Sequence, residues 1–186
     1  RLALEGLLDQ LQGKVSIVTN APATAAPDPA APLLSKTTVF EGAYAYLRVG
    51  RLDAGLAEQM KATFKEINAT NKLNGLVLDL RFVGGKDYTA AMAVADSFLA
   101  AEKALLSVGE ITLRSTAKED AIRLPVAVLV NQKTSGAAEA LAAVLRRSNV
   151  ALIIGVRTAG DVVLYREFPL NSGQQLRIAS SSVRYA

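Results

Sequence analysis

The hydrophobic pattern of residues 124–165 predicts the centre of a domain. It starts with a short apolar run, 126–130, of the length typical of a buried strand. Small and hydrogen-bonding residues follow, and from Ala137 the apolar positions recur at helical spacing. A second apolar run, 150–154, ends at Gly155. This strand, turn, helix and strand would leave free backbone N–H groups at the helix start, where an oxyanion can be held.

The segments around this unit continue the alternation of strands and helices. Residues 43–49 alternate between apolar and polar side chains and predict a half-exposed strand. A helix should follow from Ala54 to about Asn68, with Asp53 as its N-cap. The other predicted elements are a strand at 75–81, a helix at 88–101, and strands at 104–108, 110–114, 162–168, 174–179 and 182–185, with a hairpin turn at 171–173. Together they predict an α/β domain with a largely parallel sheet and right-handed crossovers.

The N-terminal part of the chain predicts a different organisation. Residues 2–11 place leucines on one helical face, so we expect a short amphipathic helix within an N-terminal unit of residues 1–20. Residues 21–34 are mostly Ala and Pro, which disfavour a helix or a central strand and predict a semi-rigid linker. A segment for a proline-recognising partner is the alternative. The compact domain then takes residues 35–186.

The amino-acid composition limits the kinds of functional site and partner that we expect. About half of the 186 residues are apolar and a fifth are charged, as in a folded globular protein. The chain has no Cys and no His, so we expect no metal site of the usual kinds, no cofactor and no imidazole catalysis. The net charge of +4 is spread along the chain, and no apolar run is long enough for a bilayer. We therefore expect neither nucleic-acid binding nor a membrane span.

Three ordered motifs carry a resemblance to a known family. They are GLVLDLRFVGG, VLVNQKTSGAAEALAAVL and ALIIGVRTAGDVVLY. Together they resemble the catalytic core of the C-terminal processing (tail-specific) serine proteases, which belong to the crotonase-like superfamily. The resemblance implies a crotonase/Clp-protease-like α/β core with a largely parallel sheet and flanking helices. It also implies an extended peptide or protein segment as partner, allows a homo-oligomer, and suggests an extracytoplasmic (periplasmic or secreted) location.

The catalytic residues of that family are substituted in this chain. The family uses a Ser–Lys dyad, with a glutamine that orients the lysine. Matching the motifs places Gly136 at the serine position, Asp161 at the lysine position and Tyr165 at the glutamine position. Glycine has no nucleophile, and a carboxylate with a reference pKa of about 4 is a poor general base near neutrality. The resemblance therefore implies a pseudoenzyme, a serine-peptidase-like domain without hydrolytic activity that acts in peptide binding or assembly.

Two further features belong to the resemblance. The family's oxyanion hole would correspond to the backbone N–H of Ala137 together with one from Gly84 or Gly85. The family also carries a PDZ domain between its first helix and its core, whereas this chain has only the Ala/Pro stretch there. The usual domain for capturing substrate C-termini is therefore expected to be absent from this position.

For two side chains, Ser135 and Glu139, the sequence allows two different roles. Ser135 neighbours the vacated position and could be a displaced nucleophile with an unassigned base, which would make the protein an active serine endopeptidase; its simpler role is a helix cap. Glu139 in the first turn of the helix complements the helix dipole, or with Asp161 forms a carboxylate pair. A lysine amine within hydrogen-bond reach of the Ser135 hydroxyl would separate the active from the inactive hypothesis.

Overall fold

The computed structural model describes residues 15–18, 30–170 and 174–186 of the chain. The predicted helix at 2–11, most of the Ala/Pro stretch (21–29) and the predicted turn at 171–173 lie outside the described residues. The division into units 1–20, 21–34 and 35–186 therefore stays a prediction.

A five-stranded sheet forms the centre of the domain, with strand order β2-β3-β4-β7-β8. Neighbouring strands from β3 to β8 run parallel, and only the β2–β3 pair is antiparallel. The predicted α/β class with a largely parallel sheet is thus confirmed. The strands are β2 (Leu34–Phe40), β3 (Tyr44–Val49), β4 (Gly75–Asp79), β7 (Val126–Val130) and β8 (Ala151–Gly155).

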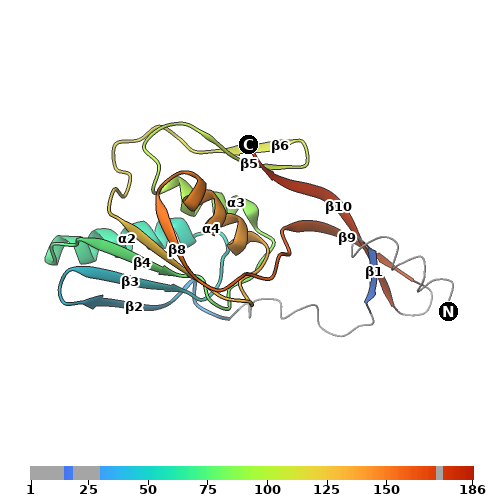
Figure 1. Ribbon diagram of the computed structural model, residues 1–186, viewed down its shortest axis with the longest axis horizontal. Helices are drawn as coiled ribbons and strands as arrows, with labels where there is room; N and C mark the ends of the chain where they lie inside the picture. The colour runs from blue at the N-terminus through green and yellow to red at the C-terminus, as the bar shows by residue number, and fades with distance from the viewer. Residues whose placement is uncertain (1–14, 19–29, 171–173) are drawn as a thin grey trace.

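Three helices cover one face of this sheet (Figure 1). They are α2 (Leu56–Thr70), α3 (Tyr88–Asp96) and α4 (Ala137–Arg147). Because the chain steps from β3 to β4, β7 and β8 in one direction, right-handed crossovers place all three helices on the same side. The core between helices and sheet is aliphatic, and its fully buried members include Leu47, Leu78, Val128, Met60, Ala95 and Leu141.

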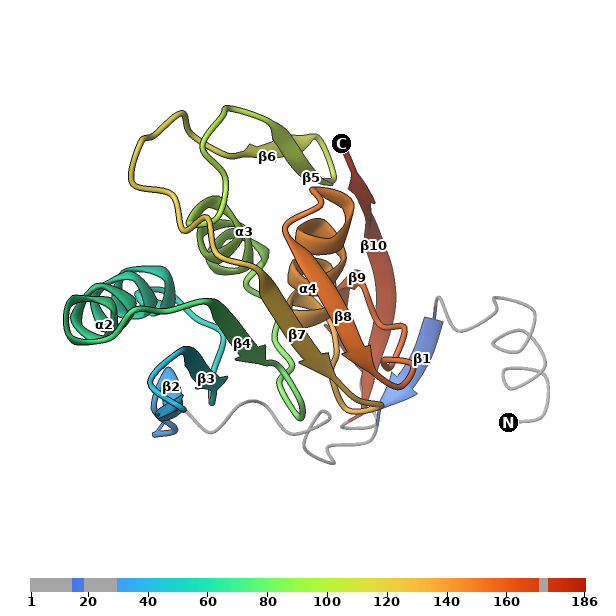
Figure 2. The same cartoon turned by 60° about the vertical axis from the view of Figure 1, so that its left-hand side comes forward.

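A second, antiparallel sheet lies beyond the helices. Its strands are β1 (Val15–Val18), β5 (Ala104–Val108), β6 (Ile111–Arg114), β9 (Val163–Pro169) and β10 (Gln175–Tyr185). Strands β5 and β6 contact α3, and β5 contacts α4, so these two helices lie between the two sheets (Figure 2). The long strand β10 pairs with β1 and β9 at its start and with β5 at its end.

Several predicted boundaries were wrong, each for a local reason. Strands β1 and β2 were not predicted, and β2 already begins within the predicted linker. The two strands predicted at 174–179 and 182–185 are one strand with an irregularity between Ala179 and Ser181. Helix α2 is capped by Gly55, with φ 87°, and not by Asp53. Helix α3 ends at Asp96 because the next three N–H groups bond three residues back instead of four.

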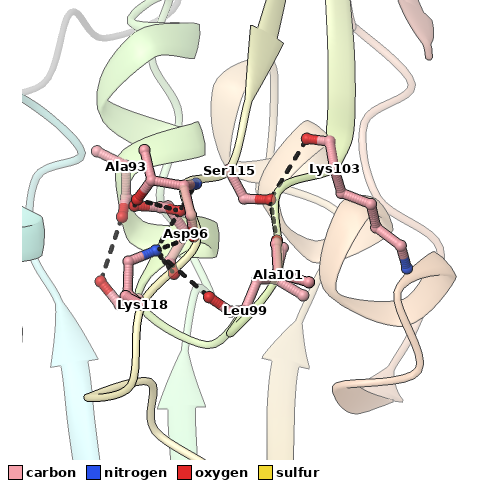
Figure 3. Close-up of polar contacts among 9 residues, drawn as sticks. Ala93, Asp96, Leu99, Ala101, Lys103, Ser115 and Lys118 are labelled. Atoms are coloured by element: carbon pink, nitrogen blue, oxygen red, sulfur yellow. Dashed lines mark hydrogen bonds and ion pairs between the residues drawn. The ribbon is translucent and has the colours of Figure 1, made fainter.

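The C-terminal end of α3 is held by one lysine (Figure 3). The amine of Lys118 pairs with the carboxylate of Asp96 and donates to the carbonyls of Asp96, Leu99 and Thr116. The lysine side chain is only 12 % exposed. Burial alone would raise the pKa of Asp96, but the bonds from Lys118 and Thr116 outweigh burial and hold this pKa below its usual value. The pair therefore ties the loop after β6 to the end of α3.

We predict that Lys118→Met lowers the free energy of unfolding by about 2 kcal/mol at neutral pH, because it leaves a half-buried carboxylate without its cation. A carboxyl with a depressed folded-state pKa contributes stability above its unfolded pKa and loses it as pH falls through the folded value. The difference between wild type and variant should therefore shrink in acid. Urea unfolding at a series of pH values measures it.

Lys103→Met is the matched control, since the Lys103 side chain points away from the cluster in Figure 3 and is exposed. It should change the free energy of unfolding by less than about 0.5 kcal/mol. Equal losses for the two variants would show that the ion pair contributes nothing specific.

Candidate active site

The candidate site forms where the parallel strands β4 and β7 end side by side. The loop after β4 (80–85) and the loop after β7 (131–136) run together from this edge, a usual place for binding sites in open α/β sheets. The N–H of Ser135 donates to the Val83 carbonyl at 3.0 Å. The buried Thr134 hydroxyl also donates to the Leu80 carbonyl, at 2.9 Å. These bonds fix the two loops against each other.

The end of β4 is anchored by a buried carboxylate. Asp79 is 0 % exposed and accepts hydrogen bonds from the Arg81 guanidinium at 2.8 and 2.9 Å and from the Tyr46 hydroxyl. Burial alone would raise the pKa of Asp79, but the bonds from Arg81 and Tyr46 outweigh it and lower this pKa. The carboxylate stays charged and directs the chain into the site loop.

Gly136, at the predicted serine position, has a positive-φ conformation that residues with side chains rarely adopt. It is the N-cap of α4, with φ 57° and ψ −119°. A Cβ on this residue would lie 2.3 Å from the Gly85 carbonyl oxygen, which is too close for any side chain. The contact between the two loops therefore depends on a missing side chain at position 136.

The expected oxyanion donor at Ala137 is not free. Its N–H donates to the Gly85 carbonyl at 2.9 Å. Ala137 is also fully buried, so no ligand oxygen reaches this group in the conformation observed. Ala137 lies next to Gly85, but the Gly85 carbonyl occupies the position that an oxyanion would need. The roles of Gly84 and Gly85 as oxyanion residues stay predictions.

Glu139 holds the start of α4 to the turn that carries Asp161. Its carboxylate accepts backbone hydrogen bonds from Gly136 at 2.9 Å, from Gly160 at 2.6 Å and from Asp161 at 2.9 Å. The side chain is 6 % exposed. Buried carboxylates are tolerated when hydrogen bonds satisfy them in this way. Glu139 is thus a structural tie between two segments of the site, a role beyond the expected complement to the helix dipole.

Asp161 and Tyr165 form a direct pair. The Tyr165 hydroxyl donates to Asp161 Oδ1 at 3.0 Å. Burial, the hydrogen bond to Asp161 and the charge of Asp161 raise the pKa of Tyr165. The buried Tyr88, at the start of α3, has its pKa raised to about 12 by burial and by the nearby carboxylates of Asp161 and Glu139. Both phenols are therefore neutral donors at physiological pH and poor general bases.

Ser135 is half-buried, and its hydroxyl lies beside Gly84, with the oxygen 2.6 Å from where a Gly84 Cβ would be. The predicted cap role is wrong, since Gly136 is the N-cap and no side-chain cap is made. Within the part of the chain that the structure describes, no hydrogen bond from a lysine amine reaches Ser135 Oγ. The amine of Lys133 lies over the Phe82 ring, 5.9 Å from its centroid.

A cavity of about 730 Å³ joins most of these residues. Ser135, Gly136, Asp161, Tyr165, Gly84 and Gly85 all line it, whereas Ala137 does not. Lining residues that the sequence did not single out as site residues include Phe82, Tyr88 and Arg177. Arg177 reaches the cavity from β10 through its pairing with β9, a relation that only strand register could have indicated.

Residues 15–18, 30–170 and 174–186 contain no group of three or more Asp, Glu, His or Cys side chains arranged to hold a metal ion. None of the helices described is both long and apolar enough to cross a membrane.

The fold and the site define a serine-peptidase-like α/β domain. The model of peptidase family S41 matches residues 43–185. The chain therefore belongs to peptidase family S41, the family of the tail-specific proteases.

Individual relatives agree with this assignment. The chain is 30 % identical over 156 residues to a carboxy-terminal-processing protease of Bartonella bacilliformis, covering 76 % of this chain and 34 % of the relative. It is 28 % identical over 137 residues to a chloroplastic C-terminal processing peptidase of Tetradesmus obliquus, covering 72 % of this chain and 29 % of the relative. The chain thus spans about a third of the length of these curated relatives.

Solved structures share the fold. A photosystem II D1 C-terminal processing protease matches with a TM-score of 0.65 and 24 % identity, over 92 % of this chain and 43 % of that one. A peptidase-like protein from Parabacteroides merdae matches with a TM-score of 0.75 and 16 % identity, over 98 % of this chain and 69 % of that one. At these identities the likeness supports the fold.

We predict that Glu139→Gln lowers the free energy of unfolding by about 2 kcal/mol, because the amide group turns a donor toward backbone donors. Glu58→Gln is the control: Glu58 also lies in the first turn of a helix but is exposed, so its loss should stay below about 0.5 kcal/mol. Urea unfolding compares the two, and amide hydrogen exchange at residues 160 and 161 should rise only in the Glu139 variant. Similar losses of unfolding free energy in the two variants would contradict the role of Glu139 in joining the two segments.

We also predict that Gly136→Ala lowers the free energy of unfolding by about 3 kcal/mol, combining left-handed strain with overlap onto the Gly85 carbonyl. Gly42 has φ 63° and open space around its missing Cβ. Gly42→Ala should therefore cost only the strain, about 1 kcal/mol. Thermal or urea unfolding measures both variants, and equal costs would mean that the overlap is relieved without penalty.

Proposed function

We propose that this domain binds an extended peptide or protein segment, alone or within an assembly, and has no hydrolytic activity. The observation that carries the proposal is the contact between Gly136 and the Gly85 carbonyl. It combines the loss of a side chain at the predicted serine position with the loss of a free N–H at Ala137. Removal of the nucleophile alone costs a serine protease roughly six powers of ten in turnover.

The side chains at the other predicted catalytic positions support the same view. Asp161 is bonded to Tyr165, and neither group can replace a neutral lysine as a general base. No lysine of the described residues has its amine bonded to a hydroxyl at the site. What remains is a shaped cavity without an arrangement of nucleophile, base and oxyanion donors.

The binding part of the proposal rests on a free strand edge beside this cavity. Among the described strands, β9 pairs only with β10, which leaves its other edge open. Val163 and Tyr165 of β9 line the cavity. An added peptide strand would gain main-chain hydrogen bonds from β9 and place alternate side chains in the cavity, as in other cases of strand addition.

The proposed cellular location rests on the family of the chain. The two curated relatives are named as processing proteases, one of them chloroplastic. An extracytoplasmic location for this chain is part of our proposal and is consistent with a role toward exported proteins.

The second candidate is an active serine endopeptidase that uses Ser135. It is favoured by one observation, that Ser135 lines the cavity and has no hydrogen bond from its hydroxyl among the described residues. It needs a base, and the described part of the chain supplies none at this hydroxyl. The following experiment distinguishes this active endopeptidase from the inactive domain.

We predict that the purified chain does not degrade unfolded casein, and that Ser135→Ala behaves identically. The double variant Gly136→Ser/Asp161→Lys should also stay inactive, because the Gly85 carbonyl fills the space beside residue 136. Gel and mass-spectrometric detection of fragments measures this, with an active tail-specific protease as positive control and circular dichroism to confirm that each variant is folded.

Cleavage by the wild type that Ser135→Ala abolishes would overturn the inactive reading and identify Ser135 as the nucleophile. Activity gained by the folded double variant would show that the Gly85 carbonyl can move aside. In that case the absence of hydrolytic activity in the wild type would be due to the residues at positions 136 and 161 alone.

A further inference from the structure

Arg177 stands out among the cavity residues by its surroundings. It lies on β10 directly opposite Glu167 of β9, and its guanidinium lies 4.1 Å from the centroid of the Tyr165 ring. Its side chain is 17 % exposed, and it lines the cavity. Stacking of a guanidinium on an aromatic ring fixes its plane before any ligand arrives. Arg177 is thus a largely buried and oriented cation.

Within the described part of the chain the Arg177 side chain forms a long ion pair with Glu167 but makes no direct hydrogen bond. Its Nε is buried and has no hydrogen-bond partner. Glu167 Oε1 lies 3.7 Å from this Nε, outside hydrogen-bond distance, and 3.8 Å from the amine of Lys86. A guanidinium has five donors in a planar fork, and leaving such donors unmet next to a cavity is costly. The guanidinium therefore lacks a hydrogen-bond acceptor among the described residues, and the residue borders the open space of the cavity.

The carboxylates that line the cavity do not serve as hydrogen-bond acceptors for Arg177. The carboxylates of Asp53, Asp87 and Asp161 each already accept a hydrogen bond, from a backbone N–H or from the Tyr165 hydroxyl. The remaining lining cations are Lys86 and Lys133. The acids of the cavity are thus engaged by the protein itself, whereas the donors of the guanidinium remain available.

We propose that Arg177 is the residue by which this cavity recognises a carboxylate of its bound peptide, as an acidic side chain or as the chain's C-terminus. The inference rests on the proposed peptide binding and adds a specificity to it. A strand added beside β9 would run past Tyr165, and a carboxylate on it could meet the guanidinium in two parallel hydrogen bonds. The carboxylate would complete a donor set that the fold leaves incomplete.

The test uses the full chain and soluble ten-residue peptide pools labelled with fluorescein. Each pool fixes one position as Glu or as its isostere Gln, and each is made with a free or an amidated C-terminus. Fluorescence anisotropy gives the affinities. We expect either one Glu pool, or the free-acid form, to bind about tenfold more tightly than its neutral counterpart. The two arms distinguish a side-chain carboxylate from a terminal one.

Arg177→Gln should remove this preference, so that acidic and neutral pools bind equally, whereas Arg177→Lys should keep part of it. Arg166→Gln is the matched control, because Arg166 lies on the same hairpin but is exposed and does not line the cavity. It should keep the full preference. Melting temperatures of all three variants confirm that they are folded.

Each other result counts against the proposal. Equal binding of acidic and neutral pools by the wild type would overturn the role of Arg177 while leaving peptide binding intact. A preference that persists in Arg177→Gln would do the same and would direct attention to Lys86 or Lys133. Binding of no pool would overturn the proposed peptide binding, and this inference with it.

Discussion

The candidate site depends on the three hydrogen bonds that the Glu139 carboxylate accepts from backbone N–H groups. One end of this contact is the first turn of α4, and the other is the turn before β9. Because a buried carboxylate is stable only with such partners, the start of the helix and the turn must stay together. The cavity lies between them, so its shape follows from one side chain rather than from the surrounding loops alone.

The domain keeps the framework of its family but differs from it at the predicted catalytic positions. The central sheet, the helix start and the buried Asp79 together build the framework of an S41 peptidase domain. Two groups at the predicted catalytic positions differ from what hydrolysis would need: Gly136 has no side chain, and the Ala137 N–H is bonded to Gly85. A binding cavity can persist under these conditions because it needs shape and donors, whereas acyl transfer needs several groups in one arrangement.

The sequence predicted the parallel core well because β3 and α4 have clear hydrophobic periods, and β4 and β7 are short apolar runs. It failed for β1 and β2, whose short segments adjoin or overlap the Ala/Pro stretch and are stabilised by pairing with distant strands. The predicted site residues except Ala137 do line one cavity. The direction of the Gly85 carbonyl could not be predicted, because glycine adopts many backbone conformations and the residue pattern does not select one of them. Arg177 was missed because strand register, and not motif spacing, brings it to Tyr165.

The contact of Gly136 with the Gly85 carbonyl also bears on how such a domain can change over generations. A single mutation to serine at position 136 would place its Cβ against the carbonyl oxygen and destabilise the fold. A mutation that turned the carbonyl away would first break the hydrogen bond to Ala137 without a compensating gain. An exchange of glycine at position 136 would therefore be tolerated only together with other substitutions, so this contact restricts which sequences the turn can accept over generations.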